Sequence, residues 1–120
     1  MKHTAMILAA LFMFSAIAIC QGLQKGDFDA RVGKEGWTLS SGTGERTYIE
    51  FVSFDKPFDA PPSVLVSLRG YDATAGKDGS VKINLAVDKI TKVGCVIKVT
   101  TWGDTKVTGV MGSWLAIASK

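Results

Sequence analysis

The sequence predicts an all-β protein of one domain, either an antiparallel sandwich or a barrel. In several short segments apolar residues recur at every second position, the pattern of a strand with one face in water. Clusters of turn-forming residues separate these segments. After residue 20 no segment has the 3.6-residue period of an amphipathic helix. About 100 residues remain there, which is the usual size of a single domain.

The first 20 residues are expected to be a secretory signal peptide, and residues 21–120 to form the domain. A basic start precedes an apolar stretch over residues 5–19. A membrane span needs about 20 apolar residues, and no second apolar stretch follows, so we expect a secreted protein without membrane insertion. Cleavage is predicted after Cys20, with cleavage after Gly22 as the alternative. A lipid anchor on Cys20 is disfavoured because the larger Ile19 precedes it.

Alternation of apolar and polar residues predicts where the strands lie. The predicted strands are roughly residues 48–54, 64–69, 81–88, 95–102 and 107–117. Residues 42–45 contain two glycines and are interpreted as a hairpin turn. Residues 25–27 are interpreted as a turn that precedes the first strand.

Charge and cysteine content exclude several classes of protein. The net charge is +3, and acidic and basic residues are mixed along the chain, so no basic patch predicts binding to nucleic acid or to an anionic membrane. Cleavage after Cys20 leaves Cys95 as the only cysteine, which excludes an internal disulfide. Because its alternation partners Ile97 and Val99 are apolar, Cys95 is predicted to be a small buried residue; a bridge between subunits is the alternative.

The sequence does not predict an enzyme. The only histidine, His3, belongs to the predicted signal peptide, so the domain has neither a histidine base nor a His-containing metal site. Two carboxylate pairs, Asp27 with Asp29 and Asp72 with Asp78, resemble in type the acid pairs of glycosidases. Solvated surface acids are the more common explanation for such pairs. No cofactor and no metal site are predicted.

Two motifs carry a resemblance to a known family. Residues 54–67 match F-x-x-P-[FY]-x-x-P-P-x-V-x-x-S, and further along the chain come Thr101-Trp102 and then S-W-L-A-I from Ser113. Weaker similarity surrounds Gly36-Trp37. In this order and spacing the motifs resemble the H-type lectin domain family, of the snail-agglutinin and discoidin C-terminal domain type.

This resemblance implies a fold and a function. The fold would be a six-stranded antiparallel β-sandwich. The function would be non-enzymatic binding of terminal sugars on cell-surface glycans or glycoproteins, with galactose and N-acetylgalactosamine as the candidate types. The sugar sites would be shallow and would lie between subunits of a homotrimer or hexamer. Such a secreted agglutinin would suit cell adhesion or innate immunity.

Strand alternation predicts the centre of the sugar site. If Ile97 and Val99 face the core, Trp102 lies on the wet face, where its indole offers a platform for a sugar ring. The alternative is that Trp102 packs under a loop or a neighbouring subunit. The other two tryptophans, Trp37 and Trp114, are predicted to pack in the core or at strand ends.

Asp104 lies beside this platform and has two interpretations. Its carboxylate would accept sugar hydroxyl groups, or it would form a turn by bonding its own backbone. The resemblance implies an arginine, a histidine, an aspartate and a glycine around the tryptophan in a member specific for N-acetylgalactosamine. Here those positions hold, in that order, Lys82, Gly103, Thr43 and Ser41.

These departures leave the sugar identity open. Lysine keeps the charge of arginine but lacks its bidentate fork, and Glu45 offers a carboxylate only if its loop is shifted. An extracellular structural or storage protein with a degenerate sugar site is therefore the alternative function. The predicted ligand-binding residues are Trp102, Lys82, Gly103, Asp104, Thr43, Ser41 and, at the rim, Thr108.

Overall fold

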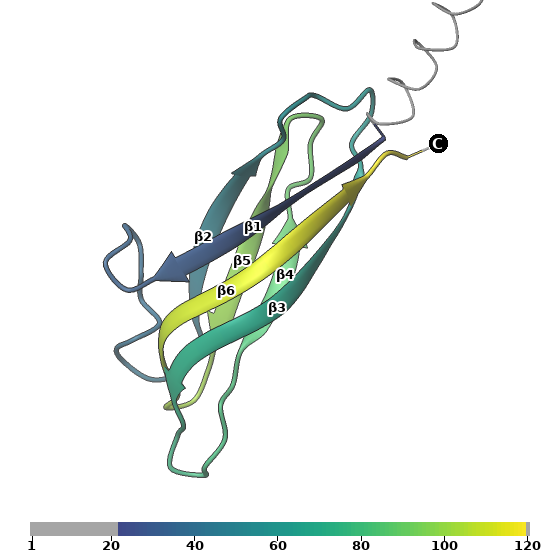
Figure 1. The fold of residues 1–120 in the computed structure, drawn as a ribbon. Helices are drawn as coiled ribbons and strands as arrows, with labels where there is room; N and C mark the ends of the chain where they lie inside the picture. The colour runs from purple at the N-terminus through teal and green to yellow at the C-terminus, as the bar shows by residue number, and fades with distance from the viewer. Residues whose placement is uncertain (1–21, 120) are drawn as a thin grey trace, which may run out of the picture.

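The computed structural model describes residues 22–119, and the predicted signal peptide lies outside the described residues. The described chain consists of strands and connecting loops, and no helix in it is long and apolar enough to cross a membrane. The strands, drawn in Figure 1, are β1 (Leu23–Arg31), β2 (Arg46–Ser53), β3 (Ser63–Thr74), β4 (Asn84–Asp88), β5 (Gly94–Thr101) and β6 (Lys106–Ile117).

The six strands form two three-stranded antiparallel sheets (Figure 1). The first sheet has the order β1-β6-β3 and the second has the order β2-β5-β4. Only β4 and β5 are consecutive in the sequence and also neighbours in one sheet; the other connections cross to the opposite sheet. The predicted six-stranded antiparallel β-sandwich is confirmed.

Two of the predicted turns are wrong. Residues 25–27 lie within β1, where they pair with residues 113–115 of β6. Residues 42–45 belong to the loop between β1 and β2, which lie in different sheets, so this loop is not a hairpin. Both errors have the same physical cause: the strand that supplies the hydrogen-bonding partner lies far away in the sequence and leaves no local signal.

β4 begins at Asn84 and not at Val81 as predicted. Thr101 Oγ1 donates a hydrogen bond to Lys82 O at 2.6 Å, and Lys82 N donates to Thr105 Oγ1 at 3.3 Å. The two threonine hydroxyl groups thus bind the backbone groups of Lys82, which would hydrogen-bond to β5 if β4 were longer. Residues 81–83 are held at the end of the sandwich as part of a loop.

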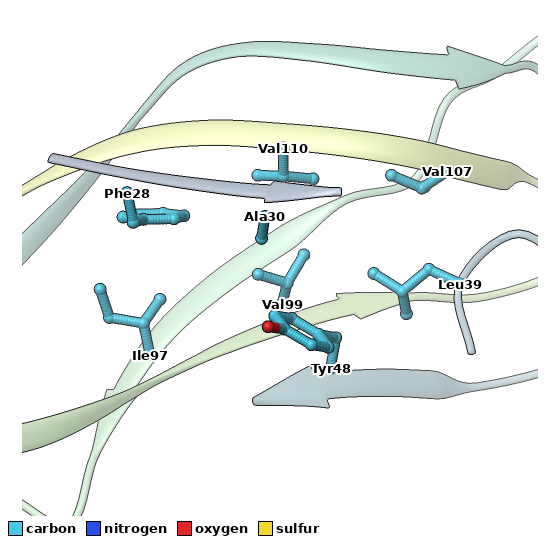
Figure 2. Packing of buried hydrophobic residues seen from close by; sticks show 8 residues of the cluster. All are labelled: Phe28, Ala30, Leu39, Tyr48, Ile97, Val99, Val107 and Val110. Atoms are coloured by element: carbon cyan, nitrogen blue, oxygen red, sulfur yellow. The ribbon is translucent and has the colours of Figure 1, made fainter. Parts of the chain in front are cut away.

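The larger buried cluster lies between the two sheets, and Figure 2 shows its side chains pointing toward one another from opposite layers. Ile97 and Val99 of β5 are fully buried, which confirms the predicted inward face of this strand. The cluster comprises Phe28, Ala30, Leu39, Tyr48, Ile97, Val99, Val107 and Val110. Leu39 comes from the loop between β1 and β2, so this core also anchors a loop.

A second buried cluster contains Cys95 with Phe54, Phe58 and Ala116. The rings of Phe54 and Phe58 meet edge to face, with centroids 5.1 Å apart. Cys95 is 4% exposed, and burial raises the pKa of its thiol. Cys95 therefore packs as a small hydrophobic residue, as predicted, because a bridge to another subunit would need the thiol at the surface.

Trp37 and Trp114 pack as the sequence predicts. The Trp37 indole donates a hydrogen bond from Nε1 to Val107 O at 3.1 Å, and its ring is tilted against Tyr48 with centroids 4.9 Å apart. The ring of Trp114 is tilted against Phe54 at 5.8 Å. Both indoles therefore belong to the partly buried rim of the core.

Gly26 leaves the space that the Trp114 ring occupies. The two residues are paired between β1 and β6, and a Cβ at position 26 would lie 2.6 Å from Trp114 Cζ2. Essentially no Cβ atom approaches another heavy atom so closely, so any larger residue must displace the indole or the strand.

We predict that Gly26→Ala lowers the free energy of unfolding by about 1–3 kcal/mol, the usual cost of overpacking a filled core. Urea unfolding followed by tryptophan fluorescence measures the change. The exposed neighbour Lys25 provides the control, since Lys25→Ala should change the free energy by less than about 0.5 kcal/mol. Equal midpoints for Gly26→Ala and the wild type would contradict the packing described for Trp114.

Candidate functional site

Three loops meet at the end of the sandwich opposite the C-terminus (Figure 1). They are residues 32–45, 75–83 and 102–105. Strand register brings them together, because Arg46 and Asn84, which begin β2 and β4, pair with the last residues of β5. Six of the seven predicted ligand-binding residues lie in these loops: Ser41, Thr43, Lys82, Trp102, Gly103 and Asp104.

Trp102 is exposed, as the alternation of β5 predicts. Thr101, the last residue of β5, is fully buried, and the next residue in an extended chain points to the opposite side. The side chain of Trp102 is 42% exposed. A large apolar surface is thus presented at the loop end.

Lys82 and Gly103 lie side by side. Gly103 adopts a φ of 68°, a conformation that L side chains rarely adopt. A Cβ built on it would lie 3.4 Å from Lys82 Nζ, so the lysine fills the space beside this glycine. Glycine therefore suits the positive φ of the turn, and the ammonium group lies at ordinary contact distance beside it.

The ammonium group of Lys82 is fixed by Asp78, with 2.9 Å between Nζ and Oδ2. The other carboxylate oxygen of Asp78 accepts bonds from the Ser80 hydroxyl at 2.7 Å and from the Ser80 amide at 3.0 Å. The Ser80 hydroxyl, followed by Lys82, holds the pKa of Asp78 well below its ordinary range. The carboxylate is therefore charged over the whole neutral and mildly acidic range.

Asp104 binds a neighbouring loop. Its Oδ2 accepts a hydrogen bond from the backbone amide of Lys77 at 2.9 Å. Its carboxylate also lies against Gly76, where an added Cβ would be 3.0 Å from Asp104 Cγ. This contact differs from the predicted turn with its own backbone, and it engages one of the two oxygens that the sugar-binding interpretation requires.

Ser41 and Thr43 lie on the exposed loop before β2, which is bonded directly to the Trp102 turn. Gly44 N donates to Gly103 O at 2.9 Å, and Lys106 Nζ donates to Gly42 O. These bonds place the loop next to Gly103, so residues about sixty positions apart share one surface.

Thr108 lies inside β6 and outside the three loops. Its hydroxyl group donates to Asp72 O at 3.2 Å across to β3. Its backbone oxygen accepts a hydrogen bond at 2.9 Å from the amide of Val32, the first residue of the loop over residues 32–45. The backbone of Thr108 thus contacts one of the three loops, while its hydroxyl group is engaged by β3.

Arg46, at the first position of β2, is a residue of this end that was not predicted from the sequence. Its guanidinium group donates to backbone carbonyl oxygens of both loops beside Trp102. Carbonyl acceptors are present at every residue, so the pattern of side chains gives no sign of such contacts.

The carboxylate pairs considered above have other partners. Asp27 accepts from the Ser113 hydroxyl at 2.7 Å, and Arg31 bridges Asp29 at 2.8 Å and Asp72 at 3.1 Å. These side chains are exposed. Among the described residues no group of three or more metal-binding side chains forms a candidate metal site.

The described residues form an all-β protein of the antiparallel sandwich class, with an exposed indole at one loop end. Comparison with known proteins assigns its family. The model of the H-type lectin domain matches residues 49–117. The chain belongs to the H-type lectin domain family.

A relative and two solved structures extend this result. A protein of Fuscovulum blasticum described as "ATP synthase subunits region ORF 7" is 32% identical over 105 residues, which are 88% of this chain and 87% of that protein. Recombinant discoidin II of Dictyostelium discoideum superposes with a TM-score of 0.71 over 80% of this chain at 27% identity. Wild-type discoidin II gives a TM-score of 0.73 over 82% at 26% identity. This chain covers 36% of each discoidin II chain.

We predict that the Asp78 carboxyl group titrates well below the ordinary aspartate value of about 3.9. Folding lowers the pKa of Asp78. The carboxylate therefore stabilises the folded state at pH values above the ordinary aspartate pKa, and this stabilisation is lost as the pH falls through the lowered pKa of the folded state. Side-chain carboxyl NMR signals followed from pH 7 into strong acid measure this midpoint.

Ser80→Ala should raise the Asp78 midpoint, since the Ser80 hydroxyl is the main cause of the shift. The matched control is Ser67→Ala on β3, which should leave the midpoint unchanged. An ordinary midpoint in the wild type would show that the contacts of Asp78 with Ser80 and Lys82 are not maintained.

Proposed function

We propose that this protein is a secreted lectin subunit, formed after removal of the first 20 residues, that binds terminal sugars without changing them chemically. The observation that carries the proposal is the exposed indole of Trp102 beside Lys82 and Gly103, where loops from both sheets are bonded together. Membership of the H-type lectin domain family supports it.

The surroundings of Trp102 suit a pyranose ring. The axial C–H groups of such a ring pack on an aromatic face, and its hydroxyl groups need polar partners at the edge. Lys82 has three N–H donors, and its recorded bond to Asp78 uses one of them. The remaining donors and the Asp78 carboxylate offer a sugar both a donor and an acceptor.

The same groups support a proposal on specificity. Gly103 offers no side-chain donor, and the ammonium group of Lys82 lies 3.4 Å from the point where such a side chain would begin. Lys82 then becomes the principal cationic donor beside the platform, as a point charge and not a planar fork. We therefore expect the site to be less specific for galactose-type or N-acetylgalactosamine-type sugars.

A site of this openness binds weakly. An indole edge and a few hydrogen bonds correspond to dissociation constants of about millimolar to tens of micromolar. Strong binding to a cell surface then requires several sites that engage one glycan-bearing surface together, which raises the overall affinity without new contacts at any one site. Agglutination of cells or microbes is the expected activity.

We predict that Trp102→Ala weakens binding to every recognised glycan by at least tenfold, because the stacking surface is removed. A glycan array identifies the ligands, and titration calorimetry with the strongest of them measures the change. The melting temperature should stay near that of the wild type, since the indole lies outside the core.

Tyr71→Ala is the matched control, because Tyr71 is an aromatic residue of similar exposure, 46%, on β3. It should leave glycan binding unchanged. Equal affinity of Trp102→Ala and the wild type would remove Trp102 from the site. No glycan binding by an intact wild-type assembly would favour the structural or storage function instead.

Self-association is the second part of the proposal. Outward positions of both sheets carry large apolar side chains, which is costly for an isolated sandwich. Phe51 on β2 is 82% exposed with Ile49 on the same face, and Leu65 on β3 is exposed on the opposite sheet. A homotrimer, or two stacked trimers, would cover such surfaces.

We predict the mass of a trimer or hexamer in sedimentation equilibrium, and a shift of Phe51→Ser toward smaller species because a buried phenyl ring is lost from the interface. Lys92→Ser, in the loop between β4 and β5, is the control and should keep the wild-type mass. A wild-type monomer at micromolar concentration would refute the assembly.

A further inference from the structure

Arg46 binds the backbone of both loops that flank the Trp102 turn. Nε donates to Gly44 O at 3.0 Å, and Nη1 donates to Ser41 O at 2.9 Å and Leu39 O at 3.4 Å. These acceptors belong to the loop between β1 and β2. On the other side Nη2 donates to Gly103 O at 3.1 Å and Thr105 O at 2.9 Å, in the turn between β5 and β6.

These contacts use the whole donor capacity of the side chain. A guanidinium group has five N–H bonds in a fixed plane, and here each one points to a different carbonyl oxygen. None of the ion pairs recorded within residues 22–119 involves Arg46. Its charge is therefore stabilised by carbonyl dipoles, and no donor is left for a ligand.

The acceptors surround the candidate site. Gly103 directly follows Trp102, and its carbonyl oxygen accepts from Arg46 and also from Gly44 N. Ser41 and Gly44 enclose Thr43 in the neighbouring loop. One side chain thus sets the distance between the indole-bearing turn and the loop that faces it.

We infer that Arg46 is a positioning residue for glycan binding: it holds the Trp102–Gly103 turn against the loop over residues 39–44 and does not touch the sugar. This inference rests on the proposed lectin function. Lysine cannot replace Arg46, because an ammonium group has three donors that diverge from one atom and cannot reach five carbonyls in a plane.

Arg46→Lys in the full chain tests the inference, with three measurements. Glycan affinity should fall at least tenfold, and the amide of Gly44, which donates to Gly103 O, should exchange with deuterium at least tenfold faster. The amides of Ile97 and Val99 in the core should keep their protection. A general loss of stability would instead accelerate exchange in all of these positions together.

Arg69→Lys is the matched control, since Arg69 is exposed on β3 and contacts Asp27 on β1 of the same sheet, which does not include β2. It should leave all three measurements unchanged. Wild-type affinity in Arg46→Lys, or unchanged exchange at Gly44, would overturn the role of Arg46 while leaving the lectin function intact. A wild type that binds no glycan would overturn the proposed function itself, and the role inferred for Arg46 with it.

A measurement on the wild type covers the case in which Arg46→Lys does not fold. NMR signals of the Arg46 guanidinium protons should be slow to exchange and should remain so at saturating glycan, because all five protons are engaged within the protein. New exchange or large shifts of these signals on glycan addition would show that Arg46 contacts the sugar, and would refute a purely positioning role.

Discussion

The alternation of β5 is the constraint on which the rest of the molecule depends. This strand is the centre of its sheet, and its inward residues Ile97, Val99 and Thr101 are fully buried against the opposite sheet. Burial of that face removes a large apolar area from water and fixes the register of the strand. Trp102 then has no inward position available, so the packing of the core places the indole at the surface.

The loop end is built from hydrogen bonds between backbone and side chains, because the loops carry few apolar residues. Arg46, Lys106 and Asp104 each reach a neighbouring loop, and each binds a main-chain group there. Gly76 permits the close approach of the Asp104 carboxylate. The result is a firmly held surface on which exposed groups, above all Trp102 and Lys82, are kept at fixed separations for a weakly binding ligand.

Much of the fold was predictable, whereas the site was predictable only in outline. Strands β2, β5 and β6 follow the alternation closely. β3 continues to Thr74, beyond the predicted end at residue 69, because register shifts after Leu68 interrupt its alternation. β1 was hidden because Lys25 and Asp27 alternate around a glycine and resemble a turn. The resemblance to the family selected residues that the structure brings together in three adjacent loops. It gave no indication of Arg46.

The sequence by itself determined the two-residue period, and with it most of the strands, the buried Cys95 and the exposure of Trp102. These are properties of one strand at a time, so neighbouring residues specify them. Only the tertiary structure decided that Lys82 lies over Gly103, that Asp104 binds Lys77, and that Arg46 joins two loops. Those contacts join distant segments through backbone groups that every residue carries, and no arrangement of side-chain types along the chain records them.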